Sequence, residues 1–337
     1  MQPRSLGRLL RWGLSLGLLG LSVVVAAQIT DWTAFVEVLG RTAYEWLWVF
    51  LPVILGAHLL RAWRWQLLVR AALGRLPGLG NAFSAVMVGY AVNSIVPRAG
   101  ELVRPYVLSR REGLSLATLL STVAVERLLD VATLALLLLV ASTLFAERLT
   151  SIVERSGGVS SVLVSLGVLA LVVAALVSIR RWGGWLLRWM HTRLPSTVQR
   201  GSKLLQELAA GVAVLRQPRL YVPLLLQTLL LWFSYWAPLY GLFWVCSLPL
   251  GPAEAFQVLV VSAVAISIAP TPSAAGVYHV AVQLALVELF AIPPAEALAY
   301  AVIAHGLNTA VALVVGGLCW LWEQLRPVGA KLATGPD

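Results

Sequence analysis

Apolar residues occur along this chain in runs of about 20, the length that one helix needs to cross the hydrocarbon layer of a membrane. We predict six full transmembrane helices, at residues 9–28, 46–69, 114–144, 159–179, 221–247 and 296–322. Two further apolar stretches, 81–111 and 255–291, are interrupted near their middle by proline. The pattern predicts an all-α polytopic membrane protein with two broken helices.

The first apolar run resembles a signal peptide, because small residues that could form a cleavage site, Ala26 and Ala27, follow it. The run is longer than the hydrophobic region of a typical signal peptide. We therefore interpret residues 9–28 as an uncleaved first transmembrane helix.

Composition supports a membrane protein, since 59% of the residues are hydrophobic and only 12% are charged. Soluble domains carry about 25% charged residues. We expect one transmembrane domain over residues 1–337. The net charge of +10 is better explained by cytoplasmic loops rich in Lys and Arg than by nucleic-acid binding. The two cysteines, Cys246 and Cys319, lie in apolar stretches and predict no disulfide and no metal site.

The positions of the arginines predict the topology. Basic residues flank the apolar runs in a pattern that places both termini in the cytoplasm, provided that the two broken segments do not cross the membrane. A full crossing by 81–111 would place Arg110 and Arg111 outside. We therefore predict two re-entrant hairpins that enter from opposite faces. The first turns at Pro97–Gly100 and the second at 270–276.

An internal duplication is indicated by the two broken segments. Aligning residues 85–97 with 258–270 pairs Ser94 with Ser267 and Pro97 with Pro270. Corresponding interruptions in two halves are typical of transporters built from inverted repeats. The repeat halves would be about 1–150 and 215–325. Residues 180–219 form a basic, Trp-rich linker, either an amphipathic helix in the membrane interface or an ordinary cytoplasmic connector.

The first broken segment carries Arg98, Glu101 and Arg104 three residues apart, so in a helix they share one face. A helix that begins at a turn in the membrane also presents free backbone N–H groups there. Together these groups suit an anionic lipid headgroup. Alternatively, both arginines pair with carboxylates and only hold the hairpin in place.

The next apolar helix carries Glu126, Arg127 and Asp130. The two carboxylates repel each other unless a cation lies between them or one is protonated. Together with the first broken segment, these residues supply three arginines and three acids, and a nearly neutral network is the least costly in a membrane. Scaffolding and proton coupling both remain open. We interpret Arg61 and Arg64, in the second apolar run, as residues that snorkel to headgroups.

The second broken segment carries Tyr278 and His279 close to its turn. His279 is either a titrating group near neutral pH or a hydrogen-bonded structural residue. The chain has no paired histidine spacing, no phosphate-binding loop and no nucleophile signature. We predict no metal, no cofactor and no catalytic residue, and hence a protein that is not an enzyme.

Three motifs resemble the flippase-like transmembrane domain of lysylphosphatidylglycerol synthases. The first is Asn-x-x-x-Pro-x-Arg-x-Gly-Glu followed by arginine, except that this chain has Arg98 directly after the proline. The second is Glu-Arg-x-x-Asp. The third is Pro-x-Pro-x-x-x-Gly-x-x-Glu, in which this chain has His279 where the family usually has glutamate. The residues that match are Asn93, Pro97, Gly100, Glu101, Arg104, Glu126, Arg127, Asp130, Pro270, Pro272 and Gly276.

This resemblance implies a flippase or transporter that moves a phospholipid or another polar-headgroup lipid between leaflets of a bacterial or archaeal inner membrane. The lipid would be its partner, and homo-oligomerisation stays open. It does not imply synthase activity. Two alternatives are an intramembrane enzyme that acts on lipid phosphate, with Glu126 or Asp130 as acid or base, and a non-catalytic partner of a lipid-modifying enzyme.

Overall fold

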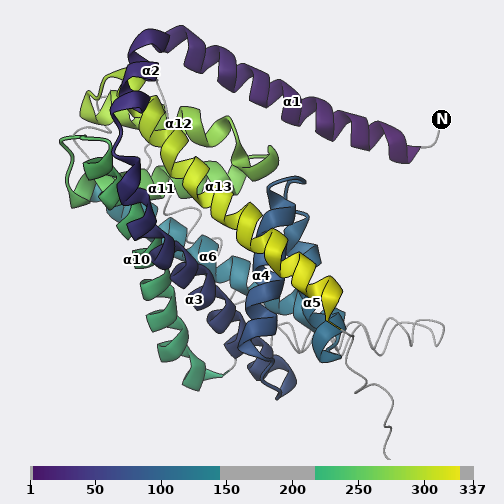
Figure 1. The fold of residues 1–337 in the computed structure, drawn as a ribbon. Coiled ribbons are helices and arrows are strands. Elements are labelled where there is room, and N and C mark those ends of the chain that lie inside the picture. Colours follow the sequence, from purple (N-terminus) through teal and green to yellow (C-terminus); the bar gives the residue numbers. More distant parts are fainter. Residues whose placement is uncertain (1–2, 145–216, 327–337) are drawn as a thin grey trace, which may run out of the picture.

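The computed structural model describes residues 3–144 and 217–326, and in these ranges it is helical without strands (Figure 1). The first part contains α1 (Pro3–Ile29), α2 (Trp32–Arg41), the 3-10 turn η1 (Tyr44–Trp46), α3 (Leu47–Leu73), α4 (Leu79–Asn93), α5 (Gly100–Glu112) and α6 (Leu116–Leu144). The second part contains η4 (Pro218–Leu220), α10 (Tyr221–Val245), α11 (Pro252–Ile268), η5 (Pro272–Ala274), α12 (Val277–Phe290) and α13 (Pro294–Leu325).

The described helices confirm a multi-pass membrane protein but not the number of six full spans. Four of them are long and apolar enough to cross a membrane: Tyr44–Leu73, Pro218–Val245, Pro272–Phe290 and Pro294–Leu325. A fifth results if Ser15–Ile29 and Trp32–Arg41, which meet at 92°, form one broken span. The predicted span 114–144 corresponds to α6, which is not among the four. The predicted span 159–179 lies outside the described residues, as does nearly all of the linker 180–219.

The same order of elements occurs twice, once in α3–α6 and once in α10–α13. Each set has a long helix, two short helices and a second long helix. Each also forms its own buried core. The first core includes Trp65, Val86, Leu108 and Leu119, and the second includes Leu242, Val258, Leu286 and Tyr300. The sets meet where α13 packs on α4, with Gly316 so close to α4 that a Cβ there would lie 2.4 Å from the Met87 carbonyl oxygen.

The first break lies where predicted, because α4 ends at Asn93 and α5 begins at Gly100. The side-chain oxygen of Asn93 accepts a 2.7 Å hydrogen bond from the backbone N–H of Gly100, one of the N–H groups without a partner in the helix. A Cβ at Gly100 would lie 1.9 Å from the carbonyl oxygen of Gly89. Two glycines thus allow α4 and α5 to fold against each other.

The second break also lies where predicted, between Ile268 and Val277. Thr271 closes the turn by donating a 2.8 Å hydrogen bond to the Ala275 carbonyl. Gly276 has φ +81°, and a Cβ there would lie 2.9 Å from Ser22 of α1. Ser15 of α1 donates to the Pro270 carbonyl at 2.7 Å. Helix α1 therefore holds this turn.

The two ends of α3 differ in chemistry. At its first end, the Trp46 and Trp244 rings contact each other at a centroid distance of 5.6 Å. Exposed indoles are typical of membrane interfaces. At its other end, Glu112 contacts Arg75 at 3.5 Å and Glu323 pairs with Arg111. The ends of α3, α5 and α13 thus form one charged end of the bundle.

Candidate functional site: a buried charge cluster

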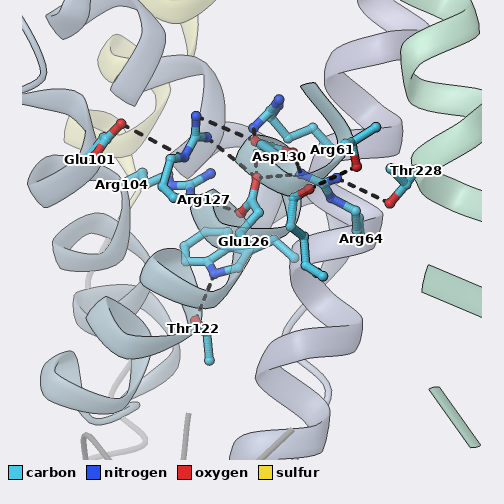
Figure 2. Close-up of polar contacts among 12 residues, drawn as sticks. Arg61, Arg64, Glu101, Arg104, Thr122, Glu126, Arg127, Asp130 and Thr228 are labelled. Carbon is cyan, nitrogen blue, oxygen red and sulfur yellow. Dashed lines mark hydrogen bonds and ion pairs between the residues drawn. The ribbon is translucent and has the colours of Figure 1, made fainter. Parts of the chain in front are cut away.

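Charged side chains of α3, α5 and α6 gather into one group of seven, which Figure 2 shows. We call them the charge cluster: Arg61 and Arg64 of α3, Glu101 and Arg104 of α5, and Glu126, Arg127 and Asp130 of α6. Helix periodicity explains the convergence, because residues three or four apart share a face. Helices α3 and α5 each contribute two such residues, and α6 contributes three.

Two arginines of α3 bridge the two carboxylates of α6. Arg61 Nη1 lies 2.8 Å from Glu126 Oε1 and 3.1 Å from Asp130 Oδ2. Arg64 Nη2 lies 3.2 Å from Glu126 Oε1 and 2.6 Å from Asp130 Oδ1. Two guanidinium groups therefore remove the repulsion that the spacing of Glu126 and Asp130 would otherwise create.

Helix α5 adds Arg104, whose Nη2 lies 2.9 Å from the second oxygen of Glu126. The Arg104 guanidinium lies over the Trp65 ring at 5.0 Å, a cation–π arrangement that is strongest where water is excluded. The Trp65 indole is fixed in turn by a 3.0 Å hydrogen bond to Thr122. Arg104 therefore pairs with Glu126 and connects α5 to α6, whereas Arg98, which the same alternative also paired with a carboxylate, contacts a backbone carbonyl.

The interior of the cluster is closed to its surroundings. Glu126 and Arg64 have no exposed surface, and Arg104 is 4% exposed. Uncompensated charges at such depth would be very costly. With four arginines against three acids, the cluster nevertheless carries one excess positive charge. Within the described part of the chain, the buried Nε–H groups of Arg64, Arg104 and Arg127 have no hydrogen-bond partner.

One edge of the cluster is open. The side chains of Arg127 and Glu101 are 38% and 40% exposed. Arg127 lies 3.5 Å from Asp130, 3.7 Å from Glu126 and 3.8 Å from Glu101, which is longer than most of the contacts inside. We call Arg127 and Glu101 the open edge. The Arg127 guanidinium is therefore held less tightly by its neighbours than the other arginines of the cluster.

Arg98 does not belong to the cluster, so the predicted balance of three arginines against three acids is wrong. It is exposed, has φ +61°, and donates a 2.6 Å hydrogen bond to the carbonyl of Ser267 at the end of α11. A guanidinium is favourable beside a helix C-terminus, where carbonyl groups lack partners. Arg98 thus connects the two breaks, following Pro97 in the first turn.

Arg61 and Arg64 are the cluster members that sequence reasoning placed incorrectly. They do not snorkel, since they are only 6% and 0% exposed. Arg61 also donates to the hydroxyl of Tyr235, at 3.0 Å, and Arg64 lies 3.4 Å from Thr228. Their spacing in the sequence could have indicated the cluster. Arg61 and Arg64 are three residues apart inside an apolar run, so both lie on one side of the helix.

The predicted residues of the second break form a separate group. His279 Nδ1 accepts a 3.2 Å hydrogen bond from Gly276 N–H, so His279 caps α12 as a family glutamate could. The rings of His279 and His305 lie 4.7 Å apart, and His305 Nε2 lies 2.7 Å from the Ser273 carbonyl. Tyr278 is buried beside them. Among the described residues, this group makes no hydrogen bond or ion pair with the charge cluster.

The described residues contain no group of three His, Cys, Asp or Glu side chains that could hold a metal ion. Guanidinium groups of α3 and α5 contact the two α6 carboxylates. Fold and site together define a polytopic helical membrane protein with a buried charge network between α3, α5 and α6.

The chain belongs to the family described as the lysylphosphatidylglycerol synthase TM region, whose family model matches residues 10–316. This match confirms the resemblance seen in the three motifs and points to a function connected with membrane lipids. No curated protein and no solved structure matches the chain.

Proposed function

We propose that the protein is a lipid flippase, which moves a lipid with a polar or anionic headgroup between the two leaflets. The observation that carries the proposal is the open edge, where a buried, net positive cluster reaches its surroundings at Arg127. Membership of a lipid-related membrane family supports the same class of ligand.

The charge balance favours an anionic headgroup. One negative charge near Arg127 would neutralise the excess positive charge, and a phosphate could accept hydrogen bonds from guanidinium groups in the planar arrangement that arginine offers. The acyl chains would stay in lipid while only the headgroup passes the protein. Only the polar headgroup of the lipid must then lose its contact with water during transport.

The two breaks supply the elements that could move. In transporters of repeated design, discontinuous helices from two halves form the site and shift against each other. The repeated order of α3–α6 and α10–α13, together with the contact between Arg98 and Ser267, is consistent with this design. We propose an inverted repeat with two re-entrant hairpins.

We further propose that the charged end formed by α3, α5 and α13 faces the cytoplasm of a bacterial or archaeal cell, with both termini on that side. The chain has no phosphate-binding loop. Transport would therefore be downhill or coupled to an ion.

The test is translocation in proteoliposomes of phosphatidylcholine that contain a small amount of headgroup-labelled phosphatidylglycerol. The purified protein should make inner-leaflet label accessible to an added quencher faster than empty vesicles do. Mass spectrometry of the same lipids separates the alternatives, because an intramembrane enzyme would change lipid mass and a flippase would not. Failure to accelerate any tested lipid while capturing a stable lipid-modifying enzyme would favour the non-catalytic partner.

A further inference from the structure

A groove of about 290 Å³ lies between α6, α11 and α12, apart from the charge cluster. Its walls are almost entirely aliphatic and include Leu138, Val260, Val264, Ile268 and Val277. Ligand sites for whole small molecules usually exceed about 300 Å³. The groove therefore fits a segment of one hydrocarbon chain better than a complete lipid.

Two polar side chains interrupt this apolar lining. Ser142 and Gln257 line the groove and are only 2% and 4% exposed. The Ser142 hydroxyl and the Gln257 side-chain oxygen are buried and have no hydrogen-bond partner among residues 3–144 and 217–326. Buried polar groups are normally paired. These two atoms therefore lack a partner that a ligand could supply.

Ser142 stands out from other hydroxyl residues of the membrane helices. Thr133 and Thr143 on the same helix donate to backbone carbonyls of the preceding turn, as does Ser262 on α11. Through this local bond, the hydroxyl groups of Ser and Thr usually find a hydrogen-bond partner within a helix. Ser142 makes no such bond and instead lines the groove.

The groove and the open edge lie along the same face of α6. Arg127 and Leu138 are about three helical turns apart on α6, so they share a face about 16 Å apart along the axis. This is close to half of the hydrocarbon thickness of a bilayer, about 30 Å. At its other side the groove includes Ile268, next to the Ser267 carbonyl that receives Arg98.

We propose that the groove is a binding site for a lipid chain that carries a hydroxyl group. Ser142 donates to the oxygen of that hydroxyl, and the hydroxyl donates to Gln257 Oε1, so that one group satisfies both. An unsubstituted chain fills the same space but leaves both atoms unpaired, which disfavours it. The proposal rests on the proposed function only in taking a lipid as the ligand.

The test uses two photoactivatable phosphatidylglycerols with equal chain length, one with a mid-chain hydroxyl and one without, in phosphatidylcholine nanodiscs holding the full-length protein. Peptide mass spectrometry measures label on residues 138–142, 257–268 and 277–281. We expect the hydroxylated probe to label these peptides about five- to tenfold more, the ratio that one net hydrogen bond provides. Ser142→Ala and Gln257→Leu should each remove this preference.

Thr143→Ala is the matched control, because the hydroxyl of Thr143 bonds to the carbonyl of Val140 and does not line the groove. It should keep the preference. Equal labelling by both probes in the unchanged protein, or label that is absent from the three peptides, would overturn the proposal. The latter includes the case in which another part of this chain fills the groove. Labelling without translocation would count against the flippase alone, and translocation without labelling against the groove alone.

Discussion

Arg98 donates a 2.6 Å hydrogen bond to the backbone carbonyl of Ser267, and this contact joins two turns that lie 169 residues apart in the chain. Ser267 lies one residue before the end of α11. The positive guanidinium therefore faces the negative end of a helix, where it is favourable. The arginine after Pro97 thus connects the two broken helices and does not take part in the charge cluster.

Arg98→Ala should loosen both turns together. The lost bond is exposed, so the free energy of unfolding should fall by only about 1 kcal/mol. Hydrogen–deuterium exchange should nevertheless become faster in residues 94–100 and also in 267–276. Arg110→Ala, an exposed arginine at the other end of α5, should change neither segment. Faster exchange confined to 94–100 would show that Arg98 does not couple the turns.

Gly100→Ala should prevent the first hairpin from closing. The added methyl group would lie 1.9 Å from the Gly89 carbonyl oxygen, a backbone atom that cannot move aside without separating α4 from α5. Gly80→Ala is the control, since a Cβ at Gly80 meets nothing within 4 Å. We expect the Gly100 variant to elute as aggregate in size-exclusion chromatography and the Gly80 variant as the native species. Normal elution and an unchanged melting temperature for Gly100→Ala would contradict the packing described.

Glu126→Gln should strongly destabilise the protein, because it leaves three buried guanidinium groups without their shared carboxylate. Removing one partner of a buried ion pair costs about 3–5 kcal/mol. Glu37→Gln, which breaks a surface pair with Arg41, should cost less than about 1 kcal/mol. Thermal unfolding in detergent measures both.

A double variant tests whether Arg104 and Glu126 interact with each other. Arg104 makes its ion pair with Glu126, so Arg104→Met combined with Glu126→Gln removes one charge of each sign. The double variant should be less destabilised than the sum of the two single variants. A strictly additive loss would mean that the two side chains do not interact.

His279 should act as a helix cap that glutamine can replace and leucine cannot. Its Nδ1 accepts from Gly276 N–H, and loss of a cap costs about 1 kcal/mol. His279→Leu should lower the melting temperature, while His279→Gln should keep it near that of the unchanged protein. Equal losses in both variants would instead assign the stabilisation to the ring contact with His305.

The breaks could be predicted from the sequence because proline and glycine act locally. Pro97, Gly100, Pro270 and Gly276 each limit the backbone of their own segment, and the observed helix ends agree with them. The pairing of Glu126 with Arg104 could also be foreseen, because both belong to adjacent helices. Local spacing was sufficient for these features.

The depth of a side chain could not be predicted in this way. Arg61 and Arg64 looked like headgroup anchors because nothing in α3 shows which face meets α6. Arg98 looked like a cluster member because its position relative to α11 depends on how the two halves pack. Burial and long-range contacts depend on tertiary structure, and a single sequence contains no direct record of that.

We propose that the open edge receives the lipid headgroup, and translocation by the Arg127→Gln variant measures this role. Arg127 is 38% exposed and its contacts are longer than most of those inside the cluster, so the variant should fold. In proteoliposomes it should move labelled phosphatidylglycerol at least about tenfold more slowly, since charge-assisted hydrogen bonds to phosphate are among the strongest. Arg110→Gln should keep the original rate. An unchanged rate for a folded Arg127→Gln protein would show that the open edge does not bind the headgroup.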